Sequence, residues 1–159
     1  MGNVPTDLDL SVIGDSAAFA QELASKLNRK QPSESQFLTF RITDSLIPID
    51  VVTARSERYE TPASLPEVSP STIENDLLRR DFSVNAMAIS LSAREWGNLV
   101  DPSNGFADIM RRRIRVLHDR SFVDDPIRLF RAVRYSVRLN FTIASQDEVL
   151  IADSLGYVD

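Results

Sequence analysis

The chain has 159 residues, 43% of them hydrophobic and 26% charged, which is typical of a globular domain, and its net charge is −5. It has no cysteine and one histidine, His118, which excludes disulfides and thiol chemistry and leaves carboxylates, the ligands of Mg²⁺, to hold any metal. No apolar run is long enough to span a membrane and no secretory signal is apparent, so we expect a cytoplasmic protein.

The N-terminal stretch predicts a strand followed by a helix. "DLDLSVIG" (7–14) predicts a strand that ends at Gly14, after which Asp15 or Ser16 is expected to cap a helix. Apolar residues spaced four apart predict the inward face of this helix. These residues are Phe19, Leu23 and Leu27.

Two further strands are predicted at 36–43 and 47–54, joined by a short turn. The next stretch, 55–70, is polar and contains three prolines, so we interpret it as a mobile loop. A helix is expected to begin near Thr72 and to run toward Arg80.

The second half predicts one more strand at 85–92, with Met87, Ile89 and Leu91 on one face, and then mainly helices. A turn at "DPSNG" and a short strand at "RIRVL" precede a helix that Pro126 opens and that continues through Leu139. A last helical piece ends at Gly156. Mixed elements followed by helices predict an α+β head and the beginning of a helical segment.

Asp7 and Asp9 alternate along the first strand, so both carboxylates are expected on one face, with Cα atoms roughly 7 Å apart. Such a pair suits divalent ions that promote phosphoryl or nucleotidyl transfer, and Asp50 is the candidate for a third carboxylate on a neighbouring strand. The alternative for Asp-x-Asp alone is a solvated strand start.

The helix 126–139 carries two stripes displaced by about 100°. The first is expected to pack inward and consists of Ile127, Phe130, Val133 and Val137. The second consists of Arg128, Arg131, Arg134 and Arg138. Four arginines without a lysine favour an anionic ligand over a solvated basic face.

A polar group interrupts the apolar stretch 76–91 and consists of Arg79, Arg80, Asp81 and Asn85. One interpretation is a local Arg–Asp salt bridge at a helix end. The other is a group of residues that bind a ligand.

The motifs "RRDFSVNAMA", "DPSNGFADI" and "DDPIRLFRAVRYSVRLNF" follow "DLDLSVIG" in that order, with "VVTARSERY" between. Together they resemble the class II tRNA nucleotidyltransferase and bacterial poly(A) polymerase family. The resemblance implies a polymerase-β-like nucleotidyltransferase head at 1–117 and the start of an all-helical neck at 118–159. The family's Gly-Gly turn and first strand are missing, so we expect a fragment that is poorly active alone.

The resemblance also implies roles for individual residues. Asp7 and Asp9 match the catalytic pair that binds Mg²⁺, and Asp50 matches a further acidic residue beside that pair. Asp125 and Arg128 match the pair that reads the incoming base. Asp124, just before them, replaces a glutamate that the family usually has at that position.

Five more residues match the part of the family that contacts the nucleotide. Arg80 and Asp81 match the motif for the nucleotide and its ribose, and Asn85 is expected to support the same pocket. Arg131 and Arg134 match residues that approach the nucleotide and its phosphates.

The function implied is template-independent transfer of CMP and AMP from CTP and ATP to the 3′ end of tRNA, releasing pyrophosphate. CC-adding, A-adding and poly(A) polymerase activities of the same family are alternatives. A truncated, non-catalytic nucleotide- or RNA-binding fragment is an alternative of another class.

Overall fold

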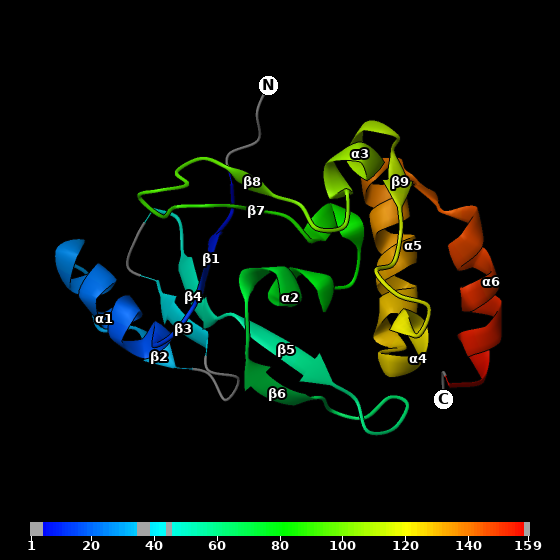
Figure 1. Ribbon diagram of the computed structural model, residues 1–159, viewed down its shortest axis with the longest axis horizontal. Coiled ribbons are helices and arrows are strands. Elements are labelled where there is room, and N and C mark those ends of the chain that lie inside the picture. Colours follow the sequence, from blue (N-terminus) through cyan, green and yellow to red (C-terminus); the bar gives the residue numbers. More distant parts are fainter. Residues whose placement is uncertain (1–4, 35–38, 44–45, 158–159) are drawn as a thin grey trace. The chain divides into compact units, whose positions relative to one another are not determined.

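The computed structural model describes residues 5–34, 39–43 and 46–157 (Figure 1). The chain forms two compact units, and its course alternates between them. Unit 1 comprises Met1–Ser56 and Ser69–Ile73, and unit 2 comprises Glu57–Val68 and Glu74–Asp159.

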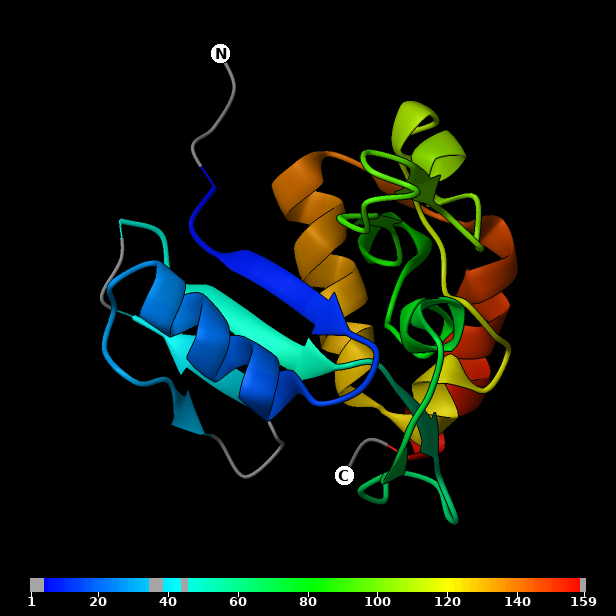
Figure 2. The same ribbon diagram turned by 60° about the vertical axis from the view of Figure 1, so that its left-hand side comes forward.

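Unit 1 is a small mixed sheet with one helix on a face. The strands are β1 (Leu8–Val12), β2 (Ser33–Glu34), β3 (Thr39–Ile42) and β4 (Ile49–Thr53). Their order in the sheet is β1-β4-β3-β2; β1 and β4 are parallel and the other pairs are antiparallel. Helix α1 (Ser16–Lys26) crosses one face, as Figure 2 shows, so this face is apolar and the opposite face is available for polar residues.

Helix α1 begins where the sequence predicts, because the Asp15 carboxylate accepts a hydrogen bond from the Ala18 amide at 2.9 Å. Its predicted inward face is only partly confirmed, because Leu23 alone of the three predicted residues packs against the core of unit 1. Phe19 and Leu27 are 41% and 43% exposed, whereas Ala20 and Ala24 are fully buried. Alanine lets the helix approach the sheet closely, and the large side chains are then placed at the margin of the contact.

The strands predicted at 7–14, 36–43 and 47–54 are confirmed as β1, β3 and β4, although residues 36–38 lie outside the described residues. The loop predicted at 55–70 is only partly a loop. Two short strands, β5 (Arg55–Arg58) and β6 (Glu67–Pro70), pair with each other. Polar side chains do not prevent this pairing, since the backbone forms the ladder. The mobility of the segment stays a prediction.

Unit 2 is mainly helical. Its helices are α2 (Ile73–Leu78, which begins at the last residue of unit 1), α3 (Gly105–Met110), α4 (Ser121–Asp124), α5 (Ile127–Leu139) and α6 (Ser145–Ser154), with 3₁₀ turns η1 (Ser83–Asn85) and η2 (Leu155–Tyr157). The short strands β7 (Ala88–Ile89) and β8 (Leu99–Val100) pair antiparallel, and β9 (Arg113–Ile114) and β10 (Thr142–Ile143) pair parallel. The helices predicted from Thr72 and Pro126 are thus confirmed, as is the short strand in 113–117.

The strand predicted at 85–92 is largely wrong. Its first residue belongs to η1, and only Ala88 and Ile89 form a strand. Ile89 and Leu91 are 63% and 56% exposed, so the alternating apolar pattern does not mark a buried face here. The Asn85 side chain donates to the Asp81 carboxylate at 3.0 Å. This hydrogen bond spans η1, the 3₁₀ turn that precedes β7.

Helix α5 presents the opposite face to the one predicted. The stripe expected to pack inward is between 57% and 77% exposed; it consists of Ile127, Phe130, Val133 and Val137. The buried residues of the helix are Arg128, Leu129 and Ala132. Leu129 and Ala132 join Phe82 and other apolar residues in the core of unit 2, and the helix packs on α4, β9 and β10. Of the arginine stripe, Arg128 faces inward, whereas Arg134 and Arg138 are exposed.

A buried aspartate holds α3 against the segment that follows Asp81. Asp108 accepts hydrogen bonds from Ser83 Oγ at 2.7 Å, from Arg113 Nη2 at 2.6 Å and from Arg115 Nε at 2.8 Å. Burial raises the pKa of Asp108, but these bonds outweigh burial and leave the pKa below its ordinary value. At Gly105, an added Cβ would lie 2.0 Å from the Ser83 carbonyl oxygen, so only glycine allows this approach.

A second buried aspartate, Asp147 in α6, has fewer partners. Its Oδ2 accepts from the Val116 amide at 2.7 Å, and its Oδ1 is buried without a hydrogen bond. Burial raises the pKa of Asp147 above its ordinary value.

Over the described ranges, no helix has the length and apolar character needed to cross a membrane.

Candidate functional site

The face of the unit 1 sheet away from α1 carries a row of charged residues. In the register of β1, β4 and β3, Asp9 lies beside Asp50, and Asp50 lies beside Arg41. Their neighbours on the α1 side are apolar and include the buried Val51. Alternation along each strand therefore brings the two predicted carboxylates together on one face, together with an arginine that the sequence analysis did not single out.

Asp7 immediately precedes β1 and is exposed. Its carboxylate accepts a hydrogen bond from Thr6 Oγ1 at 3.1 Å. No group of three metal-binding side chains is present among the residues that the structure describes, so Asp7, Asp9 and Asp50 are not gathered into a three-ligand cluster there.

The donor chemistry on this face nevertheless fits a hard divalent ion. Asp9 and Asp50 offer carboxylate oxygens from adjacent strand positions. Asp50 Oδ1 is buried without a hydrogen bond, although Arg41 Nε lies 3.4 Å away as an ion pair. The buried Oδ1 atom of Asp50 is therefore a suitable ligand for a cation.

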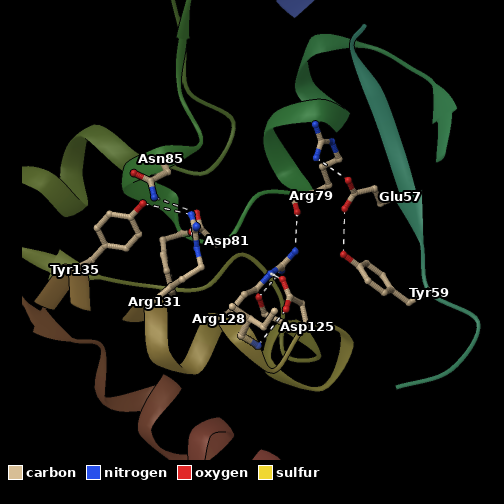
Figure 3. Close-up of polar contacts among 12 residues, drawn as sticks. Glu57, Tyr59, Arg79, Asp81, Asn85, Asp125, Arg128, Arg131 and Tyr135 are labelled. Carbon is tan, nitrogen blue, oxygen red and sulfur yellow. Dashed lines mark hydrogen bonds and ion pairs between the residues drawn. The ribbon is translucent and has the colours of Figure 1, made fainter. Parts of the chain in front are cut away.

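In unit 2, Asp81 is the centre of a polar network (Figure 3). Its Oδ1 accepts from the Phe82 amide at 2.9 Å and from Asn85 Nδ2 at 3.0 Å. Its Oδ2 accepts from Arg131 Nε at 2.7 Å, and Arg131 Nη2 lies 2.5 Å from the same oxygen. Burial lowers the pKa of Arg131, but the bond to Asp81 and its charge outweigh burial and raise it.

Arg80 joins this network from the other side. Its Nη1 donates to the Asn85 carbonyl oxygen at 3.5 Å, and its Nη2 lies 3.4 Å from an oxygen of Asp76. Arg79 also pairs with the buried Asp76, at 2.7 Å. The local salt bridge considered as an alternative thus exists for both arginines, whereas Asp81 pairs with an arginine 50 residues away.

The predicted base-reading pair forms a second group, also in Figure 3. Arg128 is 4% exposed; its Nη1 donates to Ser121 Oγ at 2.8 Å and its Nη2 to the Arg79 carbonyl oxygen at 3.1 Å. Its Nε lies 3.5 Å from Asp125 Oδ2. The Asp125 side chain keeps 35% of its surface exposed, so this pair has one fixed member and one accessible member.

The start of the segment after β5 lies beside this pair. Tyr59 donates to Glu57 at 3.1 Å, and Glu57 accepts from Arg79 at 2.7 Å. Burial and the neighbouring Glu57 raise the pKa of Tyr59 to about 12, and the charges of Arg128 and Asp125 also act on this hydroxyl. Glu57 and Tyr59 belong to the motif "VVTARSERY", whose sequence pattern alone does not indicate their partners.

Arg134 is exposed and lies over the ring of Tyr135. The structure therefore links all seven predicted residues of unit 2. Arg80, Asp81, Asn85 and Arg131 share one network, Arg128 and Asp125 join it through the Arg79 backbone, and Arg134 joins it through Tyr135.

A small mixed sheet with paired carboxylates on its open face, and an Arg–Asp network in a helical unit, define a nucleotidyltransferase head of the polymerase-β-like class. The family model described as the poly A polymerase head domain matches residues 1–115, and the chain belongs to this family.

Two curated relatives cover the chain completely. The A-adding tRNA nucleotidyltransferase of Geobacter sulfurreducens is 40% identical over 163 residues, which are 18% of its length. The CC-adding tRNA nucleotidyltransferase of Deinococcus radiodurans is 37% identical over 161 residues, which are 43% of its length. A solved structure titled "The structure of CCA-adding enzyme apo form II" matches 96% of this chain and 36% of its own, with a TM-score of 0.90 and 41% identity. The chain thus spans less than half of each of these enzymes.

Proposed function

We propose that this chain carries the nucleotide-transferring part of a tRNA nucleotidyltransferase, which adds CMP and AMP from CTP and ATP to the 3′ end of tRNA. Residues 1–117 would form the catalytic head and 118–159 the start of a helical neck. The observation that carries the proposal is the register of β1 and β4, which sets Asp9 beside Asp50 on the face of the sheet that α1 leaves open.

In this reaction the terminal 3′ hydroxyl of the tRNA gives its proton to solvent water, and its oxygen attacks the α-phosphorus of the nucleotide. The new ester bond forms as the bond from the α-phosphorus to the bridging oxygen breaks, and pyrophosphate leaves. Mg²⁺ held by Asp7 and Asp9, with Asp50 beside them, would supply positive charge to the attacking and leaving oxygens. The arginines of unit 2 would bind the nucleotide and its phosphates.

Asp125 and Arg128 have the chemistry to choose the base. Cytosine and adenine present an amino donor beside a ring-nitrogen acceptor, which match a carboxylate and a guanidinium. Uracil and guanine present the reverse pattern and would leave both groups unpaired, at about 1–3 kcal/mol per buried group. The fixed guanidinium of Arg128 and the accessible carboxylate of Asp125 support this role.

Addition of AMP alone is the second candidate. It is favoured by the A-adding relative, which is 40% identical over the whole of this chain. The two candidates differ in whether CTP is a substrate.

The test uses the 159-residue chain with two tRNAs, one lacking CCA and one ending in CC, and with each labelled nucleotide separately. Incorporation of both CTP and ATP supports CCA addition, and ATP incorporation on the second tRNA alone supports A addition. Asp9→Asn is expected to reduce transfer about a thousandfold, since metal stabilisation is worth several kcal/mol. The matched control is Glu22→Gln, an exposed carboxylate of α1. Equal activity of Asp9→Asn and wild type would exclude the assignment of the carboxylates.

A further inference from the structure

One aromatic ring in unit 2 lies against two arginine side chains. The Arg131 Cζ atom is 5.5 Å from the centroid of the Tyr135 ring, and the Arg134 Cζ atom is 5.7 Å from it (Figure 3 shows Tyr135 and Arg131). Both distances are within the range of a cation–π interaction. The spacing on α5 explains the contact with Arg131, because residues four apart are neighbours on the helix surface, whereas Arg134 directly precedes Tyr135 in the chain.

The ring is itself held in place. Phe82, which is fully buried, meets Tyr135 edge to face, with centroids 5.8 Å apart and planes at 79°. The Phe82 amide donates to Asp81, and Asp81 accepts from Arg131. Arg131 Nη2 also donates to the Tyr135 hydroxyl at 3.3 Å. Phe82, Asp81, Arg131 and Tyr135 therefore form a closed cycle of contacts. This cycle restricts the position of each of the four side chains.

The two arginines depend on the ring to different degrees. Arg131 is oriented by Asp81 as well, but its Nη1 makes no hydrogen bond within the described part of the chain. Arg134 has no ion pair there, so the face of Tyr135 is the contact that orients its exposed guanidinium. Without the ring, two like charges on one helix face would separate.

We infer that Tyr135 is a positioning residue that holds the guanidinium groups of Arg131 and Arg134 together for a polyphosphate ligand. The inference rests on the proposed function for the identity of the ligand, the triphosphate of a nucleotide. The aromatic ring is the essential part, and the hydroxyl makes a smaller contribution through its one hydrogen bond.

The test compares Tyr135→Phe, which keeps the ring, with Tyr135→Leu, which removes it, in the 159-residue chain. Phe130→Leu is the matched control, because it makes the same kind of change at an exposed position of the same helix. Calorimetry measures binding of ATP and of adenosine, which lacks phosphates. Tyr135→Leu is expected to weaken ATP binding about 5- to 30-fold and to leave adenosine binding within about twofold. Tyr135→Phe is expected to stay within about threefold of wild type for both.

Arginine side-chain NMR provides a measurement that does not need a nucleotide. The Nε–H signals of Arg131 and Arg134 are expected to lose their ring-induced shifts in Tyr135→Leu and to keep them in Tyr135→Phe and Phe130→Leu. If wild type binds neither ATP nor CTP, the proposed function fails, and the NMR comparison still decides whether the ring orients the arginines. Unchanged shifts in Tyr135→Leu, or equal losses of ATP and adenosine binding, would overturn the inference.

Discussion

Replacing Asp108 or Asp147, two of the buried aspartates of unit 2, by asparagine is expected to give very different stabilities. At Asp108 the change removes a charge that three side chains share, including Arg113 and Arg115. Removing one partner of a buried ion pair costs about 3–5 kcal/mol. The side chains of Arg113 and Arg115 are 34% and 21% exposed, so water can solvate them and offset part of this cost. The free energy of unfolding is therefore expected to fall by about 3 kcal/mol.

At Asp147 the same substitution is expected to cost less than about 1 kcal/mol. Its Oδ2 accepts a hydrogen bond from the backbone amide of Val116, and an asparagine oxygen can accept the same bond equally. Burial raises the pKa of Asp147, so its negative charge opposes folding at neutral pH, and asparagine removes that cost.

The pH dependence of the two aspartates has opposite sign. The folded pKa of Asp108 is lowered, so its stabilisation is complete above the unfolded pKa, about 3.9, and is lost as the pH falls through the folded value. The folded pKa of Asp147 is raised, so its penalty is complete above that folded value and is relieved as the pH falls toward the unfolded one.

Thermal unfolding at pH 7 and pH 5 measures these effects. For a chain of this size Asp108→Asn should lower Tm by about 6–12 °C at pH 7, and Asp147→Asn by less than about 4 °C. As the pH falls from 7 through the folded pKa of Asp147, wild type should gain stability relative to Asp147→Asn. Equal losses of Tm in the two variants, or a larger loss at Asp147, would refute the reasoning from hydrogen-bond partners.

Two further outcomes are expected. Gly105→Ala should lower the free energy of unfolding, measured by chemical denaturation, by about 1–3 kcal/mol or more, because the new Cβ meets the backbone carbonyl of Ser83, which cannot rotate away. Unchanged stability would show that α3 and the Ser83 segment separate easily. Asp125→Ala should weaken discrimination against UTP by about 1.5–3 kcal/mol in single-nucleotide incorporation, with Asp124→Ala as the control; an equal loss for all four nucleotides would mean that Asp125 does not read the base.

The sequence was sufficient for β1, β3 and β4 and for the common face of Asp9 and Asp50, because alternation along a strand fixes which residues share a face, but it did not predict β2. It was not sufficient for α5. The helix has two candidate faces, and the apolar one is exposed. Arg128 is buried because Ser121 and the Arg79 carbonyl accept hydrogen bonds from it, and no local pattern indicates a partner 49 residues away in the chain.

The candidate site of unit 2 shows the same limit. Asp81 and Arg131 were both predicted as site residues, but their pairing across 50 residues depends on the tertiary fold. Tyr135 was overlooked because an aromatic residue in an arginine-rich helix has no fixed role until its neighbours are known. Alanines on the inner face of α1 were overlooked because periodicity gives more weight to large apolar side chains than to close packing.

The alternating course of the chain has a consequence for protein engineering. Unit 1 consists of Met1–Ser56 and Ser69–Ile73, so the polypeptide passes from one unit to the other three times. Two of these passages lie in paired strands, β5 and β6, and the third lies in the first turn of α2. A proteolytic cut or a split of the gene after Ile73 therefore keeps all of unit 1 on one fragment, together with residues 57–68, but no single cut releases unit 2 intact. Preparing unit 1 alone requires a designed bridge from Ser56 to Ser69 that replaces residues 57–68.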